Sequence, residues 1–152
     1  MSVKDNRKKL DKVLKQLDLT AAMYVVVGIP KSAPPRDGDT SVTMAEVAFF
    51  NEFGTVNAPE RSFIRATVDK ERDKYFRMQE TFVDAIYQGK IEPKKALGVL
   101  GEQAKADIQR TIAAGVAPAN AESTIERKGS SKTLVDTGAL RQAIDYEIRG
   151  AK

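Results

Sequence analysis

The sequence predicts an α+β domain in which a small antiparallel sheet packs with three or four helices. Residues 21–29 form a β-branched apolar run, and apolar and charged residues alternate at 142–149, so strands are expected near both ends. Between them, apolar residues recur three or four positions apart, as in amphipathic helices. The chain length suits a single domain spanning residues 1–152. Helices are expected at about 3–18, 43–53, 62–88 and 94–114.

The N-terminal helix is expected to be amphipathic and basic. Leu10, Val13, Leu14 and Leu17 fall on one stripe at helical spacing. Residues 1–18 hold six Lys or Arg residues against three Asp residues. Such a face can meet DNA or an acidic partner, but it is more often the solvated side of a helix. We favour the solvated side.

The next two elements have clear boundaries. The run at 21–29 is continuous, so this strand is expected to be well buried, and Pro30 ends it. Thr43 and Glu46 have the spacing of a capping box, which predicts the start of a helix. Gly54 follows the last apolar residue of that helix and suits the left-handed conformation that ends one.

Glycine and proline divide the second half of the chain. Gly89 ends the long helix at 62–88, and Pro93 suits the first turn of the helix that follows. Residues 116–133 then form a long connection that is rich in Ala, Ser, Gly and Pro. Connections of this length in compact domains are usually functional or mobile.

Composition excludes several classes of chemistry. The chain contains neither Cys nor His, which removes disulfides, thiol nucleophiles, Cys/His zinc sites and imidazole catalysis. Most routes to hydrolytic or metal catalysis are therefore closed, and we expect no cofactor and no metal, but carboxylate chemistry and backbone phosphate cradles remain open. The net charge of +4 is a mild excess. No apolar run is long enough to span a bilayer, and charged residues interrupt the N-terminal apolar stripe, so we expect a protein without a signal peptide, located in the cytoplasm.

Two carboxylates on the second predicted helix are candidates for an acid–base or metal pair. Glu46 and Glu52 are six positions apart, which places them on different faces of a helix. Capping and solvation explain them better.

One short motif suggests catalysis. Asp136, Thr137 and Gly138 follow two apolar residues, which resembles the active-site loop of retroviral-type aspartic proteases, where two Asp carboxylates share one proton. One motif in each chain would require a homodimer. Those proteases are almost wholly β, whereas this chain is predicted to be largely helical. We favour a structural role, in which Asp136 or Thr137 caps a helical turn beginning at Gly138 and Leu140 enters the core. Replacing Asp136 with Asn distinguishes the two interpretations.

A wider set of motifs, in order along the chain, resembles the tail-completion or head–tail joining proteins of long-tailed bacteriophages. Those proteins typically carry a helix ending in E-F-G-T, a short loop, a P-x-R-P-F-[LI]-R segment opening a long helix, and a T-G-x-L segment leading into a strand. Ser62 stands where the family usually has Pro. The matching residues are Glu52, Phe53, Gly54, Thr55, Pro59, Arg61, Phe63, Arg65, Thr137, Gly138 and Leu140.

The resemblance implies a non-enzymatic structural protein of the virion neck. It would form a ring, of six copies, between the head connector or adaptor protein and the tail terminator or tail tube protein, and would be assembled in the host cytoplasm. A basic surface could face the DNA passing through the lumen. A third interpretation is a toxin-like or nucleic-acid-binding regulator, which salt-sensitive DNA binding by the isolated protein would favour.

Physical reasons can be given for the central motif. Gly54 lets the chain reverse directly after the helix. Phe53 and Phe63 are expected to be buried on either side of that turn. Arg61 and Arg65 are four positions apart, on one face of the following helix, and their forked donors suit carboxylates or carbonyls. Whether they bind their own loop or a neighbouring subunit stays open at this point.

Overall fold

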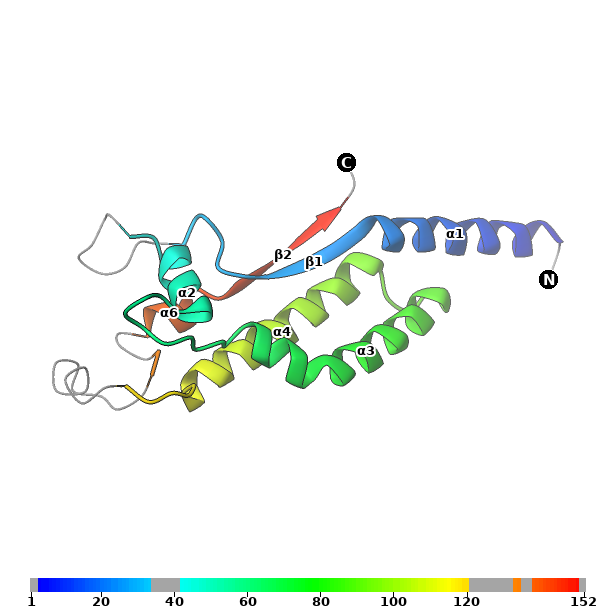
Figure 1. The fold of residues 1–152 in the computed structure, drawn as a ribbon. Helices are drawn as coiled ribbons and strands as arrows, with labels where there is room; N and C mark the ends of the chain where they lie inside the picture. Colours follow the sequence, from blue (N-terminus) through cyan, green and yellow to red (C-terminus); the bar gives the residue numbers. More distant parts are fainter. Residues whose placement is uncertain (1–2, 34–41, 121–132, 135–137, 151–152) are drawn as a thin grey trace. The chain divides into compact units, whose positions relative to one another are not determined.

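The computed structural model describes residues 3–33, 42–120, 133–134 and 138–150 (Figure 1). These residues form five helices and a two-stranded antiparallel sheet, which confirms the predicted α+β class. Asp136, Thr137 and most of the predicted connection at 116–133 lie outside the described residues. The elements in chain order are α1 (Val3–Ala22), β1 (Met23–Gly28), α2 (Met44–Phe53), α3 (Arg65–Tyr87), α4 (Pro93–Ala114), α6 (Ala139–Gln142) and β2 (Asp145–Gly150).

The chain divides into two compact units, each described by itself. Unit 1 comprises residues 1–26, 72–103 and 147–152, and unit 2 comprises residues 27–71 and 104–146. The long helices α3 and α4 each contribute residues to both units.

Unit 2 contains a continuous hydrophobic core. Phe63, Ile108, Ile112 and Ile144 are wholly buried, and they come from the segment before α3, from α4 and from the segment before β2. Met44 and Ala48 bring α2 into the same core, and Leu140 brings α6, so α2 and α6 lie in contact. Burying such side chains contributes about 1.5–3 kcal/mol each.

Unit 1 has a smaller buried set, contributed by the last turns of α3 and the first half of α4. Ile86, Ala96 and Leu100 are its buried apolar residues. In α1, by contrast, Leu10 and Leu14 remain about half exposed. Within the described ranges, no helix combines the length and the apolar character that crossing a bilayer requires.

The N-terminal elements differ from the prediction in length and burial. Helix α1 continues to Ala22 rather than ending near residue 18, and the strand follows at Met23 with no loop between them. The hydroxyl of Thr20 donates to the carbonyl of Gln16 at 2.7 Å, which keeps this residue within the helical pattern. The expectation of a well-buried β1 is wrong: within the described part of the chain the strand pairs with β2 alone, and Tyr24 is 55% exposed. A β-branched run describes a strand, but burial depends on what covers its faces.

Candidate functional site

Helix α2 places a carboxylate inside the core of unit 2. Met44, Ala48 and Glu52 are spaced four positions apart, so they form one stripe along the helix, and all three are buried. Glu52 is only 4% exposed. The expectation that this residue is solvated is therefore wrong. A buried carboxylate is tolerated only where hydrogen bonds replace its lost water.

Five hydrogen bonds hold the Glu52 carboxylate. The amides of Phe63 and Ile64 donate to Oε2 at 2.8 and 2.9 Å. The Ser62 hydroxyl, the Arg65 amide and the Arg65 Nε donate to Oε1 at 2.7, 3.0 and 3.1 Å. The three amides belong to the first turn of α3 and the residues just before it, which otherwise lack acceptors. Glu52 therefore caps α3 from a different helix, and α3 begins at Arg65 rather than at the predicted residue 62.

The balance of these contacts keeps Glu52 ionised. Burial by itself would raise the pKa of Glu52, but hydrogen bonds from the amides of Ile64 and Arg65, the hydroxyl of Ser62 and the amide of Phe63 together lower the pKa below its ordinary value. Donors aligned at a helix N-terminus favour a negative charge there. The carboxylate is thus held as an anion inside the core.

Arg65 joins this carboxylate to the loop and to an exposed ring. Its Nη2 donates to the main-chain carbonyl of Glu52 at 3.0 Å and to Oε1 of Glu60 at 2.7 Å. The guanidinium lies 4.6 Å from the centroid of the Phe53 ring. Phe53 is 52% exposed, so the expectation that it is buried is wrong, whereas the expectation for Phe63 is confirmed.

The loop between α2 and α3 is tight. Gly54 has φ +74° and ψ 176°, a conformation that residues with a Cβ rarely adopt. A Cβ at this position would lie 2.8 Å from the Glu60 amide nitrogen and 3.0 Å from the Ala58 carbonyl oxygen. Thr55 and Ala58 exchange two main-chain hydrogen bonds, at 2.8 and 3.2 Å. Pro59, which follows this bridge, is exposed. The loop therefore requires glycine at its first position.

Arg61 fastens the end of this loop to a distant segment of the same unit. Its amide donates to the carbonyl of Asn51 at 2.7 Å. Its Nε and Nη2 donate to the carbonyls of Pro118 and Ala119 at 2.9 and 3.2 Å. Arg61 precedes α3, so the prediction that Arg61 and Arg65 share one helical face is wrong. Both guanidinium groups bind carbonyls or carboxylates of their own chain.

The exposed side of α2 was not predicted as a surface. Phe49, Phe50 and Phe53, called here the phenylalanine stripe, are 58%, 45% and 52% exposed. The ring centroids of Phe49 and Phe53 are 4.8 Å apart, and those of Phe49 and Phe50 are 6.2 Å apart. Val56, at the tip of the following loop, is fully exposed. The signal in the sequence was that α2 carries apolar residues on both of its sides.

The C-terminal motif meets the central motif in the same core. Leu140 is 7% exposed and belongs to the cluster that contains Phe63, which confirms its predicted place in the core. Gly138 has φ +79° and directly precedes α6, without a side-chain cap of its own. The capping role predicted for Asp136 or Thr137 lies outside the described residues.

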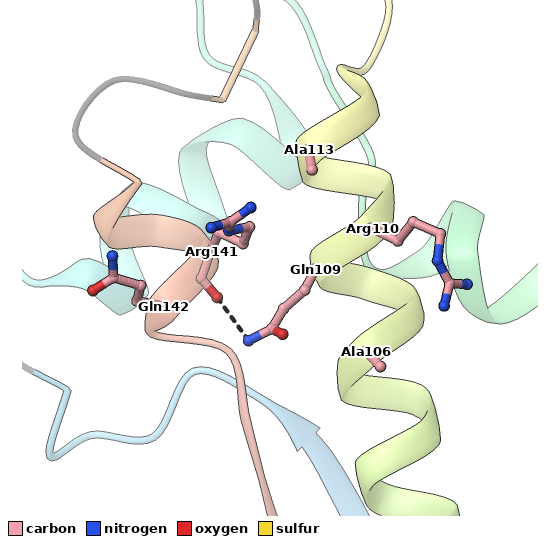
Figure 2. Close-up of a pocket in the computed structure, with 6 residues that line it drawn as sticks. All are labelled: Ala106, Gln109, Arg110, Ala113, Arg141 and Gln142. Carbon is pink, nitrogen blue, oxygen red and sulfur yellow. Dashed lines mark hydrogen bonds between the residues drawn. The ribbon is translucent and has the colours of Figure 1, made fainter.

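A shallow depression of about 400 Å³ lies between α4 and α6 (Figure 2). Nε2 of Gln109 donates to the carbonyl of Arg141 at 3.1 Å across it. Arg110 points away from Arg141, and its Nη1 lies 2.8 Å from a carboxylate oxygen of Asp107. The two guanidinium groups do not converge, so the depression lacks the paired donors that would hold an anion.

The described residues contain no group of three or more His, Cys, Asp or Glu residues that could bind a metal ion. Glu46 forms the predicted capping box with Thr43, accepting from its amide at 2.7 Å, while Glu52 points into the core, so the two carboxylates have separate tasks. Comparisons with protein-family models, with curated proteins and with solved structures return no match for this chain.

Proposed function

We propose that this chain is a non-enzymatic virion structural protein that completes the tail or joins head to tail at the neck of a long-tailed bacteriophage. The proposal rests first on the ordered set of motifs that resembles that family. In this mechanism the protein works through the shape of its surfaces, as a ring of identical copies between the head connector and the tail.

The observation that carries the proposal is the convergence of these motifs in unit 2. Glu52 caps the helix that Arg65 opens, and Phe63 and Leu140 share one core. Glu52, Arg65 and Leu140 therefore help to fix the position of α2, which carries the exposed phenylalanine stripe. A rigid surface of this kind suits a protein whose task is to fit against neighbours, because little entropy is lost when it binds.

The location follows from the same proposal. The chain would be assembled in the host cytoplasm and end in the virion, in contact with the head connector or adaptor protein on one side and the tail terminator or tail tube protein on the other. The basic residues of α1, which number six against three Asp residues, could face DNA in the lumen.

Disruption of the gene in a phage that carries it tests this function. We expect lysates in which DNA-filled heads and complete tails accumulate separately and in which few infectious particles form. Addition of purified protein to such a lysate should restore joining. Heads and tails that join normally without the protein would show that the proposal is wrong.

A further inference from the structure

The part of helix α3 that belongs to unit 1 carries an uncovered apolar surface. Phe76, Val83 and Tyr87 are 50%, 48% and 64% exposed. They are seven and four positions apart, so they lie on one face of the helix, called here the α3 stripe. The same turns bury Ile86, which is 3% exposed, so the helix is anchored on one side while the stripe stays outside. Large apolar side chains gathered on one exposed face mark a contact surface.

An apolar depression of about 340 Å³ adjoins this stripe within unit 1. Val83 lines it on α3, and Leu97 and Leu100 line it on α4. Beside it, the guanidinium of Arg72 lies 5.4 Å from the centroid of the Phe76 ring. A hollow next to an exposed aromatic ring lets two such surfaces interlock, because the ring of one can enter the hollow of the other.

Charged side chains are distributed unevenly along this part of α3. Residues 72–79 hold three basic residues and one acidic residue, a net charge of +2 (3 − 1). Residues 80–87 hold two acidic residues and no basic residue, a net charge of −2. Four of these charged side chains are exposed and, in the described part of the chain, belong to no ion pair: Arg72, Arg77, Glu80 and Asp84.

This distribution makes the helix complementary to itself in one orientation. Glu80 and Asp84 are four positions apart, and like charges at that spacing destabilise a helix unless a basic group lies near them. Two copies of α3 that pack antiparallel place the basic half of each against the acidic half of the other. Parallel packing would instead oppose like charges. Charge therefore selects a second copy, in antiparallel orientation, as the occupant of the α3 stripe.

We propose that the free protein forms a dimer in which α3 of two copies packs antiparallel along the α3 stripe, about a two-fold axis. Arg72 of each copy lies beside Asp84 of the other, and the Phe76 ring meets Val83 and the depression of the other copy. The contact is isologous, so it ends at two copies. A ring built by rotation about one axis has no two-fold axis between neighbours, so this dimer is distinct from the proposed ring and does not rest on it.

Exchange of charges tests this pairing by sedimentation equilibrium of the full-length protein. Arg72→Asp alone and Asp84→Arg alone each place like charges across the contact at two points, so each should raise the Kd of the dimer about tenfold or more. An equimolar mixture of the two variants should regain the parent's Kd, because each replaced side chain then meets an opposite charge on the other copy. The matched control is Glu102→Arg, at an exposed position of α4, which should dimerise like the parent.

Several results would overturn the proposal. One is a parent protein that stays monomeric up to its highest soluble concentration. Another is a mixture of the two variants that dimerises no better than either variant alone. A third is a Glu102→Arg variant weakened as much as Asp84→Arg. Far-ultraviolet circular dichroism and urea midpoints that match the parent show that the variants are folded, so that a lost dimer is not a lost fold.

Cysteine cross-linking locates the two-fold axis, since the chain has no native Cys. The register that pairs Arg72 with Asp84 places the axis near Gln79, whose side chain is exposed. Mild oxidation of full-length Gln79→Cys should give a covalent dimer, whereas Gln88→Cys, the same replacement at an exposed position just past the end of α3, should stay monomeric. Equal yields from the two variants, or a dimer from Gln88→Cys alone, would refute the antiparallel pairing and leave the joining function to its own test by gene disruption.

Discussion

Replacing the buried Glu52 with Gln should destabilise the protein far more than the same Glu→Gln replacement at an exposed position. The amide side chain keeps one acceptor oxygen and puts an NH₂ group where the second oxygen was. In one orientation the NH₂ group faces the amides of Phe63 and Ile64, and in the other it faces the amide and Nε of Arg65. Either way, two N–H donors lose their acceptor.

The size of the effect follows from these contacts. Each donor left unsatisfied in a buried position costs about 1–3 kcal/mol. Arg65 is half exposed, so water replaces part of what its side chain loses. We therefore expect a loss of about 3 kcal/mol in the free energy of unfolding, between one and two such penalties. For a chain of this length, that corresponds to a fall of about 6–12 °C in Tm.

Urea unfolding followed by circular dichroism at the helical band measures this loss. The matched control is Glu60→Gln, since Glu60 also pairs with Arg65 but is 55% exposed and should contribute less than about 1 kcal/mol. If Glu52→Gln loses no more stability than Glu60→Gln, Glu52 is not the cap of α3 that the geometry describes, and the reasoning is refuted.

Three further predictions use the same unfolding assay. The folded-state pKa of Glu52 lies below its ordinary value of 4.5, so the contribution of the ionised carboxylate to stability is present above that value and is lost as pH falls through the folded pKa. The difference in unfolding free energy between the parent and Glu52→Gln should therefore be constant at neutral pH and shrink below about pH 4.5. A difference that widens at low pH would contradict this. Gly54→Ala should lower the free energy of unfolding by about 2 kcal/mol or more, because its Cβ would lie 2.8 Å from a main-chain nitrogen at a positive φ. Gly28→Ala, whose Cβ meets no atom within 4 Å, should lower it much less. Equal losses would refute the steric argument. Leu140→Ala should lower the free energy of unfolding by about 2–5 kcal/mol, whereas Leu19→Ala, at a 43% exposed residue, should lower it by less than about 1 kcal/mol. A small loss for Leu140→Ala would show that Leu140 does not belong to the core.

Local patterns in the sequence predicted the parts of the fold that local chemistry controls. The capping box of Thr43 and Glu46 forms within a single turn, so its spacing was sufficient. Gly54 was correctly placed as the residue after α2, although its ψ of 176° lies outside the left-handed helical conformation that was predicted. Leu140 was correctly placed in the core. The α+β class followed from periodicity alone.

The role of Glu52 could not be read from local patterns, because its partners lie 10 to 13 positions away. The stripe of Met44, Ala48 and Glu52 nevertheless indicates that Glu52 is buried and hydrogen-bonded. A charged residue at the third position of an apolar stripe requires hydrogen bonds within the core. The outward orientation of Phe53 has the same origin. Once Glu52 turns inward to α3, its neighbour along the helix must face another direction.

Electron microscopy of purified particles tests the central claim most directly. The protein is given a small affinity tag in a phage that carries this gene. Purified particles are then decorated with a gold-labelled reagent that binds the tag, and are imaged. We expect label at the joint between head and tail, with a ring at that position in averaged images. Label along the tail or on the capsid, or intact particles without label, would contradict the proposed place of this protein in the virion.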